Sequence, residues 1–129
     1  MRAILDTHTL IWAQDSPVKL GVSARSILSN PTHQLLLSTA TIREIGIKVA
    51  IGKLKLSLPY RTWIEKAFLD LDLIELPIEL RFVDHLIGLP FHHRDPFDRM
   101  LASQALVEGI PLIGGDAMFD AYGIHRIWN

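Results

Sequence analysis

Short runs of apolar residues alternate along the chain with longer segments in which apolar positions recur at helical spacing. The short runs are typical of buried parallel strands. They lie at residues 3–5, 34–38, 73–76, 111–113 and 124–128. Helices are expected between them, from residue 10 and at about 23–30, 41–51, 60–69, 78–87 and 96–108. Strands that alternate with helices predict an α/β fold, with a parallel sheet of about five strands between helices on both faces.

Residues with strong backbone preferences mark several helix ends. Gly52 follows the helix expected from Thr41, as a glycine at a helix C-terminus does. Asp95 and Pro96 form a helix start, because an aspartate caps the free N–H groups and proline fits the first helical position. Asp98 then lies in the first turn, where it gains from the helix dipole. Capping explains Asp95 well but leaves Asp98 open to another role.

Carboxylates from four separate segments are expected at one edge of the sheet. Ligands bind outside the carboxyl ends of parallel strands. Asp6 directly follows the first strand, and Asp116 follows the fourth. Glu44 lies early in the helix after the second strand, although its spacing from Thr41 also matches a capping box. With Asp98, these side chains are expected to meet at a common rim.

Such an acidic group predicts a metal site. Like charges that converge raise one another's pKa values, and a bound divalent cation removes that cost. Hard oxygen donors in a chain without cysteine favour Mg²⁺ or Mn²⁺ over zinc. A site of this kind can activate water for the hydrolysis of a phosphodiester.

The overall composition narrows these possibilities. The chain has 129 residues, of which 49% are hydrophobic and 21% charged, so we expect one folded domain, residues 1–129. No run reaches the roughly 18 apolar residues of a membrane span, and no signal peptide is expected because Asp6 interrupts the first apolar run. The absence of cysteine fits the cytoplasm. A net charge of −1 means that nucleic-acid binding would need a local basic patch.

Four sequence segments carry a resemblance to a known family. They read Ile-Leu-Asp-Thr-His-Thr-Leu at 4–10, Ser-Thr-Ala-Thr-Ile-Arg-Glu-Ile-Gly-Ile-Lys at 38–48, Asp-Pro-Phe-Asp-Arg-Met-Leu-Ala-Ser-Gln-Ala at 95–105 and Leu-Ile-Gly-Gly-Asp at 112–116. In their order and context they resemble a PIN domain, most of all the VapC-type toxins of bacterial toxin–antitoxin pairs. The resemblance runs from Arg2 to Trp128.

The resemblance implies a three-layer α/β/α PIN-like domain that acts as a metal-dependent endoribonuclease. The matched acidic positions are Asp6, Glu44, Asp98 and Asp116, and Asp6 and Asp98 match the usual metal ligands of the family. The resemblance also implies an RNA substrate, a cognate antitoxin protein that covers the groove, and a homodimer. Either one metal ion or a second one that joins with the RNA is compatible with the sequence.

Other residues have ordinary interpretations beside functional ones. His92 and His93 stand in a polar loop, where solvation is favoured over a role as metal ligands. His8 could contact the substrate, but a position facing solvent or a partner is favoured. Basic residues that flank the acidic segments are candidate phosphate contacts: Arg43, Lys48, Lys53, Lys55, Arg94 and Arg99. Arg99 would alternatively screen Asp98. The aromatic residues expected in the core, or secondly at a dimer or antitoxin surface, are Trp12, Trp63, Phe68 and Phe82.

Two other functions compete with the ribonuclease. Asp6-Thr-His-Thr and the segment from Gly115 to Asp120 have the form of motifs in haloacid-dehalogenase-type phosphatases. His8 argues against this alternative, because it stands where that family has a general-acid aspartate. A non-catalytic PIN-like binding module is the second alternative. The loss of one of the four acids would favour it, but all four are present.

Overall fold

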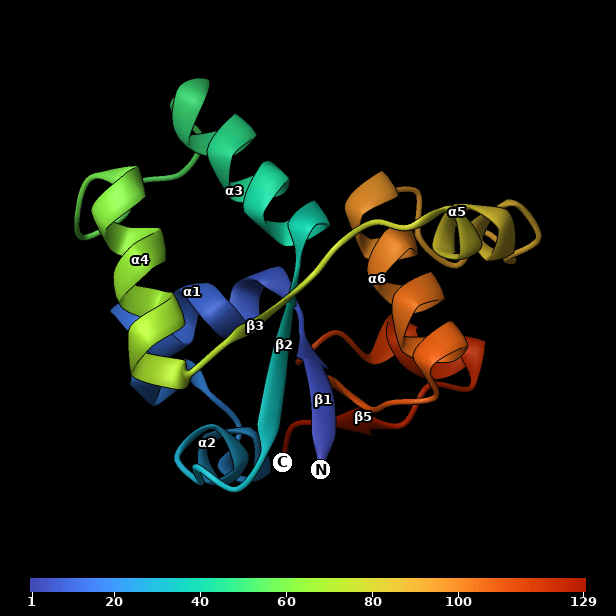
Figure 1. Cartoon of the computed structure of the whole chain (residues 1–129), viewed down its shortest axis with the longest axis horizontal. Helices are drawn as coiled ribbons and strands as arrows, with labels where there is room; N and C mark the ends of the chain where they lie inside the picture. Colours follow the sequence, from blue (N-terminus) through green and yellow to red (C-terminus); the bar gives the residue numbers. More distant parts are fainter.

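A five-stranded parallel sheet forms the middle of the molecule in the computed structural model, which describes residues 1–129 (Figure 1). Its strand order is β3-β2-β1-β4-β5. The strands are β1 (Arg2–Leu5), β2 (Gln34–Ser38), β3 (Ile74–Leu76), β4 (Leu112–Ile113) and β5 (Arg126–Ile127). Ile4 of the central strand pairs with Leu36 on one side and Leu112 on the other. The predicted parallel sheet of five strands is confirmed, with shorter strands at its β5 edge.

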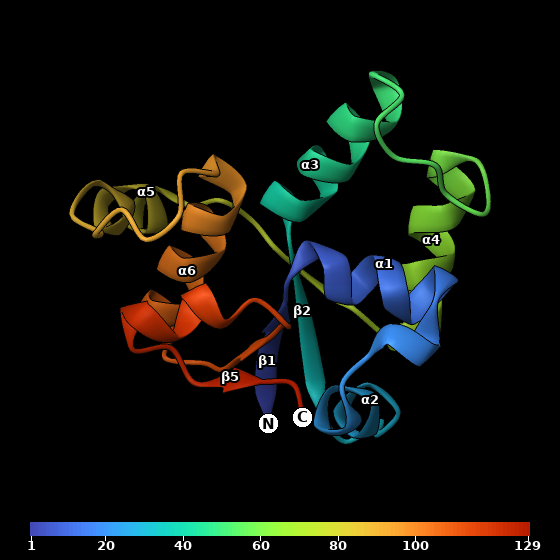
Figure 2. The ribbon, with the colours of Figure 1, turned by 180° about the vertical axis from the view of Figure 1, so that it is seen from behind.

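Helices cover both faces of this sheet. They are α1 (Thr7–Asp15), α2 (Val22–Leu28), α3 (Thr39–Ala50), α4 (Tyr60–Leu71), α5 (Leu80–Ile87) and α6 (Pro96–Glu108), with 3-10 helices η1 (Pro17–Lys19) and η2 (Ala117–Tyr122). The two opposite views place α1, α2 and α4 on one side and α5 and α6 on the other (Figures 1 and 2). This is the predicted three-layer α/β/α arrangement.

Successive residues of the strands contribute to two separate hydrophobic cores, one on each face of the sheet. Ile4 packs with Phe82 and Leu101 on the α5–α6 side. Its neighbour Leu5 packs with Trp63 on the α1–α4 side. Successive strand residues point to opposite faces, so a sheet covered on both faces needs apolar residues at every position. The prediction that Trp63 and Phe82 are core residues is therefore confirmed, whereas Phe68 and Trp12 are only partly buried.

Local capping decides where the helices begin. The side chain of Ser38 accepts a hydrogen bond from the Ala40 N–H, so α3 begins at Thr39 and not at Thr41 as predicted. Asp6 caps α1 in the same way, so this helix begins at Thr7, earlier in the sequence than the predicted residue 10. The predicted start of α6 is confirmed, because Asp95 accepts hydrogen bonds from the N–H groups of Phe97 and Asp98. No helix is long and apolar enough to cross a membrane.

Candidate functional site

One pocket of about 320 Å³ at the carboxyl edge of the sheet contains all four predicted acidic residues. Each comes from a different place in the fold: Asp6 between β1 and α1, Glu44 on α3, Asp98 in the first turn of α6, and Asp116 before η2. The remaining residues that line the pocket are Thr7, His8, Lys48, Asp95 and Phe119. Parallel topology brings these segments together because every strand ends at the same edge.

Asp6 is fixed and desolvated at the base of this pocket. It is 5% exposed, and its Oδ1 accepts a 2.7 Å hydrogen bond from the Thr9 N–H. Burial raises the pKa of Asp6, and the hydrogen bonds with Thr9 oppose part of that rise. A Cβ at Gly114 would lie 2.5 Å from the Asp6 Oδ2 atom, so the end of β4 can approach this carboxylate only as glycine.

Glu44 is held by two side chains and does not cap its helix. Thr7 Oγ1 donates to one carboxylate oxygen at 2.6 Å, and Lys48 Nζ lies 2.6 Å from the other. The capping-box interpretation of Thr41 and Glu44 is therefore wrong, since Ser38 is the N-cap residue. The hydrogen bond to Glu44 raises the pKa of Lys48. Lys48 thus places a positive charge inside the acidic pocket, paired with a carboxylate.

Of the four acids in the pocket, Asp98 is the one whose carboxylate has no hydrogen-bond donor from the protein. Its side chain accepts no hydrogen bond from the chain, although its backbone N–H is bonded to Asp95. Burial, followed by the charge of Asp95, raises the pKa of Asp98 to about 7. Glu44 and Asp6 add smaller contributions in the same direction, and His93 opposes them.

Asp116 is oriented by His93, which the sequence did not predict at the site. His93 is only 8% exposed, so the prediction that it is solvated is wrong. Its Nε2 lies 2.8 Å from Asp116 Oδ2, and its Nδ1 lies 3.0 Å from the Tyr122 hydroxyl. Its ring also packs on Phe119, at a centroid distance of 4.6 Å. These contacts come from residues more than twenty positions along the chain, so the local sequence around His93 holds no signal for them.

The hydrogen bond to Asp116 places a proton on Nε2 of His93. Burial alone would raise the pKa of Asp116, but the hydrogen bonds from His93 and from the Met118 N–H outweigh it and lower the pKa. An ionised carboxylate can only accept, so Nε2 of His93 donates to Asp116. The Tyr122 hydroxyl accepts from the His93 backbone N–H at 3.1 Å and lies 3.0 Å from Nδ1. Tyr122, His93 and Asp116 are therefore linked by a continuous series of hydrogen bonds.

A group of possible metal ligands lies at this pocket: Asp98 and Asp116 line it, and His93 contacts Asp116. One ligand atom from each of His93, Asp98 and Asp116 lies within 4.8 Å of the other two. This group contains two of the four predicted acids and adds the histidine, whose Nε2 is already bonded to Asp116. Carboxylate oxygens dominate the surroundings, and such donors suit a divalent cation.

Comparison with known protein families agrees with this geometry. The PIN domain family model matches residues 3–124. The chain belongs to the PIN-domain family. No curated protein sequence matches it significantly.

Solved structures share the PIN fold at low sequence identity. A chain of the VapBC2 complex from Rickettsia felis, bound to a promoter DNA fragment, matches with a TM-score of 0.73 and 15% identity over 100% of both chains. A chain of VapBC-1 from nontypeable Haemophilus influenzae matches with a TM-score of 0.65 and 20% identity, over 98% of this chain and 97% of that one. A chain of FitAcB from Neisseria gonorrhoeae matches with a TM-score of 0.66 and 16% identity, over 97% of this chain and 96% of that one. At these identities the likeness establishes the fold alone.

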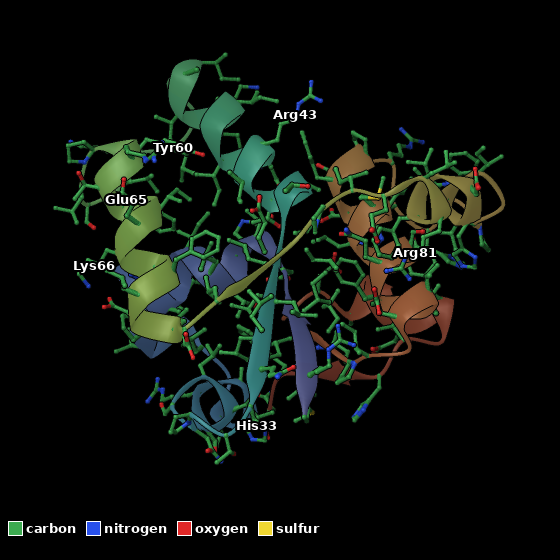
Figure 3. All side chains as sticks on the ribbon, viewed as in Figure 1. His33, Arg43, Tyr60, Glu65, Lys66 and Arg81 are labelled. Carbon is green, nitrogen blue, oxygen red and sulfur yellow. The ribbon has the colours of Figure 1, made fainter.

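The predicted basic residues have different surroundings in this PIN domain. Arg99 is buried and donates to the backbone carbonyls of Leu86, Leu89 and Pro90. It therefore holds the connection between α5 and α6, and both the phosphate contact and the screening of Asp98 predicted for it are wrong. Of the predicted phosphate contacts, Arg43, Lys53, Lys55 and Arg94 are exposed. Figure 3 shows Arg43 at the surface of α3.

Proposed function

We propose that this PIN domain is an Mg²⁺- or Mn²⁺-dependent endoribonuclease and the toxin of a toxin–antitoxin pair. The observation that carries the proposal is the convergence of Asp6, Glu44, Asp98 and Asp116 on one pocket from four separate segments. A purely structural role does not require four carboxylates at one place, because their mutual repulsion is unfavourable. No finding supports the phosphatase or the non-catalytic alternative.

The residues present fit a divalent cation. Asp98 has no hydrogen-bond donor in the chain and a raised pKa, so a cation would supply the partner that it lacks. Asp6, Asp98 and Asp116 would hold the ion, with Glu44 contributing directly or through water. When bound, the cation supplies Lewis-acid activation of the phosphate and of the attacking water.

The side chains around the acids orient them for hydrolysis. Thr7 and Lys48 fix both oxygens of Glu44, and His93 fixes Asp116. Carboxylates held in this way would orient a water for attack on phosphorus and accept its proton. The ribose oxygen opposite the water would leave with the electrons of the broken P–O bond and take up a proton from solvent. The ammonium group of Lys48 offsets part of the negative charge that would otherwise repel the RNA backbone.

Apolar surfaces of the PIN domain fit the proposed protein partners. The solved relatives include complexes described as toxin–antitoxin complexes. A pocket of about 520 Å³ between α3 and α4 would take an apolar antitoxin segment. Its lining residues are Ile42, Tyr60, Arg61, Ile64, Glu65, Phe68 and Leu69. Tyr60 and Glu65 can be located on this side in Figure 3.

A separate surface fits a homodimer. Leu80, Val83 and Ile87 form one stripe along α5 and are all exposed. An apolar stripe at this spacing suits helix packing between two copies of the chain. The size of the particle in solution, measured by light scattering for wild type and Ile87→Glu, tests this assignment.

Cleavage of a mixed RNA pool tests the nuclease. Wild-type protein with Mg²⁺ or Mn²⁺ is expected to cut RNA, and EDTA is expected to stop it. Asp98→Asn should lower the rate by at least about 100-fold, because a metal ligand with no substitute is lost. Asp84→Asn is the matched control, since this aspartate lies exposed on α5 away from the pocket. Hydrolysis of a phosphate monoester without RNA cleavage would instead support the phosphatase.

A further inference from the structure

A second pocket, of about 360 Å³, opens next to the acidic one. The residues that line it are Asp6, His8, Trp12, Lys19, Gly115, Asp116 and Trp128. Asp6 and Asp116 also line the acidic pocket. A nucleotide whose phosphate lies at the acids would therefore have this second pocket within reach. We call it the tryptophan pocket.

Besides the two carboxylates and Gly115, the tryptophan pocket is lined by aromatic rings and one cation. The ring centroids of Trp12 and Trp128 lie 5.8 Å apart with a tilt of 52°, and the His8 ring lies 5.5 Å from that of Trp12. Lys19 Nζ is 5.9 Å from the centre of the Trp12 ring. Both indoles are partly exposed. Neither indole N–H donates to the chain, whereas the buried Trp63 donates its own to Asp15.

The backbone is shaped to hold Trp128 in this position. A Cβ at Gly115 would lie 3.1 Å from the indole, so glycine lets the ring pack against the turn that carries Asp116. On the other side, the Trp128 carbonyl accepts a 3.0 Å hydrogen bond from the Ala24 N–H. A Cβ at Gly21 would lie 2.1 Å from that carbonyl oxygen. These contacts therefore fix the position of Trp128 in the pocket wall.

We propose that the tryptophan pocket binds the nucleobase of a nucleotide next to the scissile phosphate. The proposal rests on the proposed ribonuclease function. Unpaired bases stack on aromatic side chains in single-stranded RNA recognition. The carboxylates of Asp6 and Asp116 at the rim would repel a second phosphate, so an uncharged base fits the pocket better than the RNA backbone does. Lys19, which lines the same pocket and is exposed, can contact the next phosphate.

Base removal measures the contribution of the pocket. A short RNA with one mapped cleavage site is compared with the same RNA carrying an abasic residue on either side of that site. For the wild type, kcat/KM should fall roughly 5- to 100-fold when the base that enters the pocket is missing. Trp12→Leu should lower kcat/KM on the complete RNA by a similar factor and leave the value on that abasic RNA unchanged. Trp12→Phe, which keeps a ring, should retain most of the effect.

Two comparisons separate the subsite from folding and from the nuclease itself. Phe91→Leu is the matched control, because it removes an exposed ring that lines neither the tryptophan pocket nor the acidic pocket. Circular dichroism checks the fold of each variant. If the wild type cleaves RNA but the abasic residue has the same effect in Trp12→Leu, the subsite is wrong and the nuclease stands.

If the wild type cleaves no RNA, the proposed function fails, and fluorescence anisotropy then compares the binding of a short single-stranded RNA with that of an abasic RNA of the same length. Base-dependent binding that is lost in Trp12→Leu supports the subsite. Binding of equal strength with and without the base overturns it and leaves the tryptophan pocket to a protein partner.

Discussion

Replacing Asp98 by asparagine should stabilise the metal-free protein at high pH. In the folded chain the pKa of Asp98 is raised from 3.8 to about 7, first by burial and then by Asp95. The folded state therefore binds more protons than the unfolded state between these values. The free energy of unfolding must then fall as pH rises from about 4 to 7 and stay low above that range. Asparagine carries no charge, so Asp98→Asn removes this loss.

The size of the effect follows from the shift. About three pKa units correspond to roughly 4 kcal/mol, and solvent screening at this partly exposed carboxylate reduces the figure to about 1–2 kcal/mol. At pH 8 in EDTA, urea unfolding should thus show Asp98→Asn more stable than wild type by about 1–2 kcal/mol. Below about pH 3 the two proteins should be alike, because Asp98 is then largely protonated in both states.

Bound metal should reverse this order of stability, so that the wild type becomes more stable than Asp98→Asn. A ligand at 100 times its dissociation constant stabilises the folded state by about 2.7 kcal/mol. Mg²⁺ should therefore stabilise the wild type at pH 8 and add little to Asp98→Asn. Asp84→Asn, the exposed control on α5, should follow the wild type under every condition. The reasoning is refuted if Asp98→Asn is no more stable than wild type in EDTA at pH 8, or if both gain equally from Mg²⁺.

Substitutions at three further positions test how the acids are held. His93→Ala should weaken Mg²⁺ binding by about 10- to 100-fold in calorimetric titration, because Asp116 loses its donor, while His93→Gln should recover part of it. Gly114→Ala should lower both stability and RNA cleavage, since its Cβ would lie 2.5 Å from Asp6 Oδ2; unchanged cleavage would contradict this packing. Asp95→Asn should cost about 1 kcal/mol or less in urea unfolding, because asparagine also caps helices.

The order of strands and helices follows from the sequence because it depends on local patterns. Apolar runs such as 34–38 are long enough for a strand covered on both faces, and Asp95-Pro96 is sufficient to start a helix. Parallel topology then places Asp6 and Asp116 at one edge without any knowledge of side-chain contacts. Asp98 was also predicted to belong to the acidic group, because helix capping explains Asp95 but does not explain Asp98.

Only the tertiary structure decided which partners these side chains have. Glu44 matched a capping box, but contacts with Thr7 and Lys48 hold it in the pocket. His93 and Arg99 looked solvated or RNA-facing, yet both are buried against segments distant in the sequence. Burial of a polar group is favourable only when its donors and acceptors are satisfied, and those partners come from elsewhere in the chain. For that reason the sequence determined where the acids lie, and the fold determined what orients them.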